Sequence, residues 1–258
     1  MRTQNYLEEA LVEATVKMLL IKATRRRFNR TSYYRDLSLR TRRAEVKMKS
    51  IMRKFFKAQM NHVNSKKDIY SGWMFDLSEW NERLVNESIE FIKILVAEQG
   101  SQVLRKLRLI VPGLEISFDV ENPYVQEWIK NHVFEFANQV NETTQEALRT
   151  QISEGLAAGE GTGEIATRIE SVYEEASGYR AERISRTEVM TASNQGAIEG
   201  YRQSEVVSKK EWLTAPGCCD SCDELSGEVV GIDEMFSGGV ESPPLHTNCL
   251  CCVLPVID

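Results

Sequence analysis

The first 70 residues alternate between helical apolar stripes and polar breaks. Over residues 5–24, apolar side chains recur at alternating spacings of four and three. This spacing predicts a helix with a narrow seam like that of a coiled coil, which must pack against another helix or chain. Residues 41–63 repeat the helical spacing with larger side chains, and a polar break follows from Asn64 to Gly72.

A further helix is predicted to begin at Asp76. Asp76 is followed three residues later by Glu79, a pattern typical of a capping box. We expect this helix to end near Gly100. The segment 111–113 (Val-Pro-Gly) predicts a turn, and the alternation of apolar and polar residues over 114–120 predicts a short strand.

The middle of the chain reads as helices joined by a glycine-rich turn. Asn122 and Pro123 have the residue types favoured at the N-cap and at the first helical position. A separate helix is predicted over 143–158 and another over 164–176. The glycine-rich segment 159–163 follows a helix and not a strand, so we interpret it as a helix–helix turn and not as a phosphate-binding loop.

A helix over 179–203 has an unusually polar stripe on its expected buried side. Buried polar groups need hydrogen-bond partners. We therefore predict a structural polar network that includes Arg186, Glu188 and Asn194 and that extends to the C-terminal part of the chain. Glu188 as a catalytic acid is the weaker alternative, and we assign no catalytic residue.

After Gly200 the pattern changes from helix to short strands. Segments 209–214, 228–232 and 251–257 have the composition of strands, and they predict a small antiparallel sheet. The fold class predicted from the whole pattern is mainly α, with a helical N-terminal part followed by a small α+β C-terminal unit.

All cysteines of the chain lie in this C-terminal unit, in two clusters. The first reads C-C-x-x-C, and the second reads H-x-x-C-x-C-C after a gap of about two dozen residues. Two short clusters of Cys and His joined by a flexible loop are the arrangement that a tetrahedral structural Zn²⁺ needs. The predicted ligands are Cys219, Cys222, His246 and Cys249, with Cys251 as a substitute for either of the last two.

Three other interpretations of these cysteines fit the sequence less well. Reduced thiols packed as small apolar side chains suit Cys252 and Cys218 but not the clustered pairs. Structural disulfides are disfavoured because we expect an intracellular chain without a signal peptide. A thioredoxin-like redox pair is expected to open a helix after a strand, whereas Pro216 and Gly217 precede this one and a glycine-rich loop follows.

Charge is distributed very unevenly along the chain. Residues 1–67 hold 18 Lys and Arg against 5 Asp and Glu, a net charge of +13, although the whole chain carries −6. A basic segment of this density predicts an anionic partner, either double-stranded DNA or an acidic protein surface. A solvated helical face balanced by the acidic remainder of the chain is the alternative. The candidate contact residues are Arg25, Arg26, Arg27, Arg30, Arg42 and Arg43.

The C-terminal motifs resemble those of a known protein family. E-W-L-T-A-x-x-x-C-x-x-C-x-x-L-x-G (211–227) and P-P-L-H-x-N-C-x-C (243–251) resemble the C-terminal signature of the phage Mu F-like minor head proteins, the phage head morphogenesis family. Segments 152–169 and 180–196 are similar to the middle portion of that family. The resemblance covers about the last 110 residues, and nothing before about residue 140 carries it.

The resemblance implies a structural phage head protein. It implies portal and capsid proteins as partners, a place inside the capsid after assembly in the host cytoplasm, and an influence on DNA packaging or ejection. No apolar run long enough for a membrane span is present. The predicted division is a basic helical arm (1–67), a helical segment and connector (68–120), and a head-protein-like domain with the zinc unit (121–258).

An enzyme is the alternative class of function. A zinc deaminase also needs an H-x-E motif, which the chain lacks after His62 and His132. A DNA-processing enzyme or a toxin-like effector attached to a head-protein module stays open, without a catalytic constellation to support it. Neighbouring genes for a portal and a terminase would distinguish these classes from a head protein.

Overall fold

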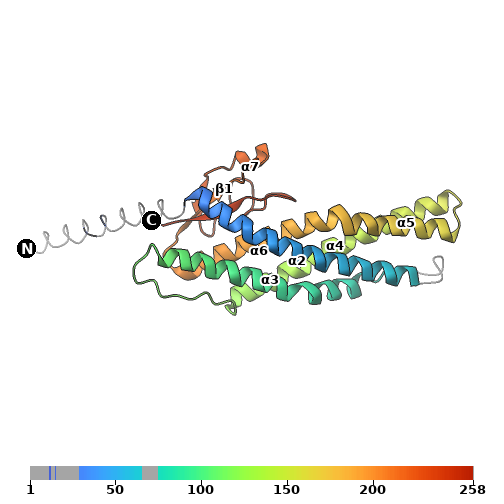
Figure 1. The fold of residues 1–258 in the computed structure, drawn as a ribbon, viewed down its shortest axis with the longest axis horizontal. Helices are drawn as coiled ribbons and strands as arrows, with labels where there is room; N and C mark the ends of the chain where they lie inside the picture. Colours follow the sequence, from blue (N-terminus) through green and yellow to red (C-terminus); the bar gives the residue numbers. More distant parts are fainter. Residues whose placement is uncertain (1–11, 13–14, 16–28, 66–74, 258) are drawn as a thin grey trace, which may run out of the picture. The chain divides into compact units, whose positions relative to one another are not determined.

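The structure is a computed structural model that describes residues 12, 15, 29–65 and 75–257. It is mostly helical with one small C-terminal antiparallel sheet (Figure 1), which confirms the predicted fold class. The helix predicted over 5–24 lies outside the described residues, except for Val12 and Thr15, which are helical. The elements in chain order are α2 (Arg30–Ser65), α3 (Leu77–Arg108), α4 (Pro123–Ala157), α5 (Thr162–Glu175), η1 (Ala176–Arg180), α6 (Ala181–Ser204), β1 (Lys209–Leu213), α7 (Asp220–Asp223), β2 (Val229–Gly231) and β3 (Cys252–Val256).

The chain forms two compact units, and neither is a continuous stretch of sequence. Unit 1 comprises Met1–Arg42, Leu95–Val120 and Met190–Asp258, and unit 2 comprises Arg43–Ile94 and Glu121–Val189. Helices α2, α3 and α6 each contribute residues to both units. Each unit therefore draws on all three of the predicted ranges 1–67, 68–120 and 121–258, because long helices pair residues that are far apart in sequence.

Unit 2 contains the whole of α4, whose start was predicted correctly. The Asn122 side chain accepts a hydrogen bond from the Tyr124 amide at 3.0 Å, and Pro123 is the first helical residue. The separate helix predicted from Thr143 is wrong, since α4 continues to Ala157. The reason is that the Thr143 hydroxyl donates back to the Gln139 carbonyl at 2.7 Å and does not cap a new helix.

Helix α3 begins as predicted but does not end at Gly100. The Asp76 carboxylate accepts from the amides of Ser78 and Glu79 at 2.9 and 3.2 Å, which confirms the N-cap. The helix then continues to Arg108. A Cβ placed on Gly100 would lie 2.4 Å from the Phe118 ring. Gly100 thus admits a neighbouring side chain inside the helix and is not the predicted stop signal.

The strand predicted over 114–120 is absent from the described structure. The segment is extended and irregular, although its side chains alternate between half-buried and exposed. Leu114, Ile116 and Phe118 pack against the core of unit 1. The alternation therefore reflects one-sided packing and not pairing in a sheet.

Helices α3 and α6 approach each other closely in unit 1. A Cβ on Gly196 would lie 2.5 Å from the Val96 carbonyl oxygen, and one on Gly200 would lie 2.9 Å from the Gly100 carbonyl oxygen. Backbone contacts this short require residues without side chains. Both glycines belong to a stretch of α6, 192–200, that is buried on all sides.

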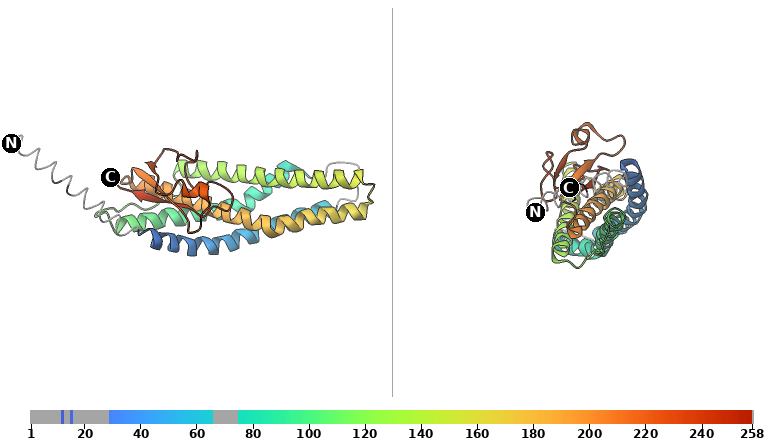
Figure 2. Two further views of the ribbon diagram at one scale, coloured as in Figure 1. Left: turned by 90° about the horizontal axis from the view of Figure 1, so that it is seen from above. Right: turned by 90° about the vertical axis from the view of Figure 1, so that its left-hand side faces the viewer.

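The C-terminal sheet has the strand order β2-β1-β3, with both pairings antiparallel. All three strands coincide with predicted segments within two residues at each end. Figure 2 shows the strands beside the C-terminal part of α6, and two hydrogen bonds fix this contact. Asn194 donates to the Cys251 carbonyl at 3.1 Å, and Tyr201 donates to the Val253 carbonyl at 3.3 Å.

A buried polar chain links three helices to this sheet. The Gln99 amide donates to the Tyr33 hydroxyl at 3.3 Å, and the Tyr33 and Tyr201 hydroxyls lie 3.2 Å apart. Arg40 donates to the Gln99 amide oxygen at 2.9 Å. Burial raises the pKa of both tyrosines, so both hydroxyls stay neutral donors at ordinary pH.

Candidate metal centre

The first cysteine cluster is shaped by a turn and a short helix. After β1 the chain turns at Gly217, whose φ of +73° favours glycine. Cys219 then occupies the N-cap of α7, and the Cys222 amide donates to the Cys219 carbonyl at 3.0 Å. This turn directs both side chains to the same side, with Cys219 exposed and Cys222 buried.

The second cluster forms a tight turn that leaves one histidine nitrogen able to bind a metal. The Cys249 amide donates to the His246 carbonyl at 3.1 Å, and Asn248 has a left-handed φ of +67°. His246 Nδ1 lies 2.9 Å from the Thr247 carbonyl oxygen. Because a carbonyl can only accept, Nδ1 carries the proton and the Nε2 lone pair is free for a metal.

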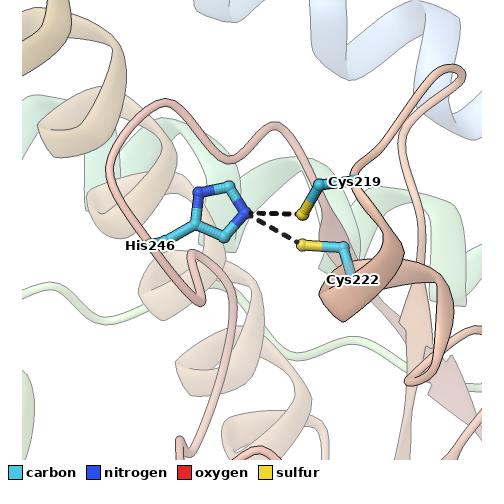
Figure 3. Close-up of side chains that lie close together, drawn as sticks. All are labelled: Cys219, Cys222 and His246. Atoms are coloured by element: carbon cyan, nitrogen blue, oxygen red, sulfur yellow. Dashed lines mark hydrogen bonds between the residues drawn. The ribbon is translucent and has the colours of Figure 1, made fainter.

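The two clusters meet around Cys222. The sulfurs of Cys219 and Cys222 both point to His246 Nε2 (Figure 3), at 3.1 and 3.3 Å. The sulfurs of Cys222 and Cys249 lie 3.7 Å apart. The five predicted ligands form two triads, each with its ligand atoms within 4.8 Å of one another: Cys219–Cys222–His246 and Cys222–Cys249–Cys251. Cys222 belongs to both.

Three of these separations are close to those around a tetrahedral zinc ion, although no four of the five ligand atoms all lie within 4.8 Å of one another. Zn–S bonds of about 2.3 Å and Zn–N bonds of about 2.0 Å at tetrahedral angles place two sulfurs about 3.8 Å apart and a sulfur and a nitrogen about 3.5 Å apart. The Cys222–Cys249 separation of 3.7 Å matches the first value. The two sulfur–nitrogen separations, 3.1 and 3.3 Å, are a few tenths shorter than the second.

The local hydrogen bonds favour thiolates at two of the five positions. A hydrogen bond from the Cys251 thiol, helped by backbone amides, lowers the pKa of Cys249 to about 5. The Cys222 amide likewise lowers the pKa of Cys219. Burial raises the pKa of Cys222 to about 12, and the hydrogen bond to Cys249 raises that of Cys251. A divalent cation would supply the positive charge that the two buried thiols need to ionise.

The two remaining cysteines do not belong to either triad. Cys252 is buried in the core of unit 1, and burial raises its thiol pKa, which confirms its interpretation as a small apolar side chain. Cys218 is half-buried, and its sulfur lies 3.9 Å from an Asp223 carboxylate oxygen. All six cysteines are free thiols in the structure.

The residues of the predicted polar network make the following contacts. Asn194 does reach the C-terminal unit: it donates to the Cys251 carbonyl and accepts from the Val253 amide, both at 3.1 Å. Arg186 instead pairs with Glu45 and Glu182. The contact with the C-terminal part of the chain is thus made by Asn194, and that part of the prediction agrees with the structure.

Asn194 holds the backbone on both sides of Cys252 and next to the candidate ligand Cys251. We expect Asn194→Ala to lower the free energy of unfolding by about 2 kcal/mol, because it leaves a buried carbonyl and a buried amide without partners. Chemical denaturation measures this change. Exposed Asn131 provides the matched control, and Asn131→Ala is expected to be neutral. Equal effects of the two substitutions would contradict the role of Asn194.

Glu188 contacts His132, a partner that the sequence pattern did not predict for it. Its carboxylate lies 2.7 Å from His132 Nε2, and its side chain is only 12% exposed. His132 also stacks on Trp128, with ring centroids 4.6 Å apart. The two residues are 56 positions apart, so no local spacing in the sequence predicts their contact.

We expect Glu188→Gln to destabilise the protein by about 1–2 kcal/mol, because a partly buried charged partner of His132 is lost. Exposed Glu170 on α5 serves as a control, and Glu170→Gln should not change stability. Thermal unfolding of both variants is the measurement. Loss of biological function in Glu188→Gln with an unchanged melting curve would favour a catalytic role and contradict the structural one.

The candidate partner-binding arginines are not equivalent. Arg25, Arg26 and Arg27 lie outside the described residues. Arg30 pairs with Glu211 of β1, so its charge is neutralised within unit 1. Arg42 and Arg43 are exposed on α2. Of the six predicted residues, Arg42 and Arg43 therefore remain as exposed candidates for binding a partner.

Known proteins match the part of the chain that carries the cysteine clusters. Residues 146–254 match the family of phage Mu protein F-like proteins. The predicted resemblance is thereby confirmed, and the Mu F-like segment includes all five predicted ligands. It begins inside α4 and ends in β3.

One curated relative extends the comparison. The chain is 29% identical over 160 residues to the uncharacterized protein YqbB of Bacillus subtilis (strain 168). The matched region covers 56% of this chain and 52% of that protein. The chain thus spans about half the length of this relative. No solved structure matches the chain. None of the helices among the described residues is both long and apolar enough to cross a membrane.

Proposed function

We propose that this protein is a structural component of a phage head and that its C-terminal unit is held together by one Zn²⁺. The observation that carries the proposal is the Mu F-like segment, residues 146–254, because it coincides with the meeting of the two cysteine clusters. The zinc ligands we propose are Cys219, Cys222, His246 and Cys249, with Cys251 as the alternative to Cys249 or His246.

The ligand set supports a structural and not a catalytic metal. A catalytic zinc keeps one position open for water or substrate, whereas four protein ligands close the site. Here the five side chains form two triads that share Cys222, so a fourth protein ligand would come from the second triad and close the site. The metal would then link α7 to the sheet. The strands of this sheet are too short to form a stable unit alone.

Within the head, we place the protein next to the portal and propose an effect on DNA packaging or ejection. The family resemblance supports this finer assignment. Purified virions test it directly: the protein should be found in them by mass spectrometry and should cross-link to the portal. Phage that lack the protein should then form defective heads. Virions without the protein, together with normal heads from the deletion mutant, would contradict the proposal.

Duplex DNA is the anionic partner we propose for the basic N-terminal arm. Binding to phosphates releases counterions, so affinity should fall with salt at a log–log slope of about −0.9 for each neutralised phosphate. Replacing Arg25, Arg26 and Arg27 by Ala should flatten that slope by up to about three such increments. Titration of the full chain with unrelated duplexes measures it. Absence of binding at low salt would exclude DNA and leave an acidic protein as the partner.

A further inference from the structure

Helix α2 carries a continuous basic stripe in unit 2. Arg43, Lys47, Ser50, Lys54 and Lys57 follow one another at spacings of four, three, four and three, which places them on one helical face. All five are exposed. Among the residues that the structure describes, none of the four cations forms an ion pair. This face thus presents four unneutralised positive charges, here called the basic stripe.

Helix α4 carries a matching acidic stripe in the same unit. Glu135, Glu142 and Glu146 are exposed, and no ion pair with a described residue neutralises them. Glu142 and Glu146 line a groove of about 810 Å³ between α4 and α5, together with Glu175. Glu135, Glu142 and Glu146, here called the acidic stripe, present negative charge on α4, and the last two do so beside this concave surface.

The spacings of the two stripes are the same when one helix is reversed. Glu135, Glu142 and Glu146 are separated by seven and then four residues, and so are Lys54, Lys47 and Arg43 in the opposite direction. Each set spans about 16 Å at a rise of about 1.5 Å per residue. Antiparallel packing of the two faces would oppose Lys54 to Glu135, Lys47 to Glu142 and Arg43 to Glu146.

We propose that the basic stripe docks on the acidic stripe of a second copy of this chain. The two stripes lie on different helices and face solvent. The basic stripe of one molecule can therefore pair with the acidic stripe of a second molecule. Charge complementarity at matched spacing selects this occupant, since a partner with irregular or sparser acidic residues would leave cations unpaired. The proposal does not depend on the metal. The basic stripe lies within the basic arm (1–67) and shares Arg43 with the candidate DNA contacts, so DNA and a second copy would compete for it.

The contact is expected to be weak and sensitive to salt. Exposed ion pairs contribute little affinity each. In the antiparallel alignment, Ser50 lies opposite Gln139 at the centre, so no apolar core adds to them. The charges therefore determine which surfaces meet and in which register, and screening should abolish the association.

Sedimentation velocity of the full chain over a range of concentrations tests the proposal. We expect self-association at about 0.1 M salt and monomers at about 1 M, where the screening length falls from about 10 Å to about 3 Å. Lys47→Glu/Lys54→Glu should be monomeric, and so should Glu135→Lys/Glu142→Lys. A mixture of these two variants, and the quadruple variant that combines them, should associate again.

A matched control separates specific pairing from net charge. Arg105→Glu/Lys130→Glu changes the net charge as much as Lys47→Glu/Lys54→Glu does, at exposed positions outside the stripes, and should associate like the wild type. A wild-type chain that stays monomeric at low salt would overturn the proposal. If that monomer also loses duplex DNA binding on Lys47→Glu/Lys54→Glu, the basic stripe is a nucleic-acid surface instead.

Discussion

The Cys222→Ser variant is expected to lose its zinc and most of the order of the C-terminal unit. Cys222 is the residue shared by both triads, and its side chain is buried. Structural zinc contributes roughly 10 kcal/mol or more to the folding of small zinc units. We therefore expect the unit to unfold locally at temperatures where the wild type is intact. Hydrogen exchange over residues 209–256, followed by mass spectrometry, measures this loss.

Cys218→Ser is the matched control for that experiment. Cys218 is a neighbouring cysteine of the same cluster, but it belongs to neither triad. Its substitution should leave both the metal content and the exchange pattern unchanged. Equal protection of the C-terminal unit in Cys222→Ser and in the wild type would contradict a metal-dependent fold.

Gly196→Ala is expected to have the second largest effect, a loss of about 3 kcal/mol, which is the upper end for an overpacked site. The added Cβ would lie 2.5 Å from the Val96 carbonyl oxygen and 2.9 Å from the Val96 Cα. Both atoms belong to the backbone of α3, so no side chain can rotate away. The helices would have to move apart, and the buried stretch of α6 would lose its packing. Urea denaturation measures the change.

Gly163→Ala controls for the general effect of replacing a helical glycine. Gly163 lies in α5, and its added Cβ would meet nothing within 4 Å. Alanine is favoured over glycine in helices by up to about 1 kcal/mol, so this variant should be as stable as the wild type or more stable. Destabilisation of both variants to the same extent would show that close helix packing is not the cause.

Sequence patterns correctly predicted the helix starts that are determined by neighbouring residues. The caps at Asp76 and Asn122 depend on side chains that bond to amides two or three residues away, and the sequence placed both correctly. Helix continuity past Gly100 and Thr143 was missed. Gly100 serves a contact with Phe118 and with α6, and Thr143 bonds back to its own helix. The packing at Gly100 appears only in the tertiary structure, whereas Thr143 is a residue type that suits both a helix start and a bond back to its own helix, so the sequence alone does not distinguish the two.

The candidate metal site was predictable for a related reason. Two residues in each cluster are close in sequence, so the chemistry of each half-site is already visible in the spacing. The division into two triads sharing Cys222 depends on how the loop between the clusters folds, which no spacing encodes. The Glu188–His132 contact and the Tyr33–Tyr201 contact join residues 56 and 168 positions apart, so their geometry appears only in the folded chain.

Metal content is the most direct test of the central claim that one zinc ion holds the C-terminal unit. Protein purified without chelators should contain about one Zn²⁺ per chain by elemental analysis. X-ray absorption should find three sulfurs at about 2.3 Å and one nitrogen at about 2.0 Å. Protein that contains no zinc, and that keeps the same folded C-terminal unit after exhaustive chelation, would contradict the account.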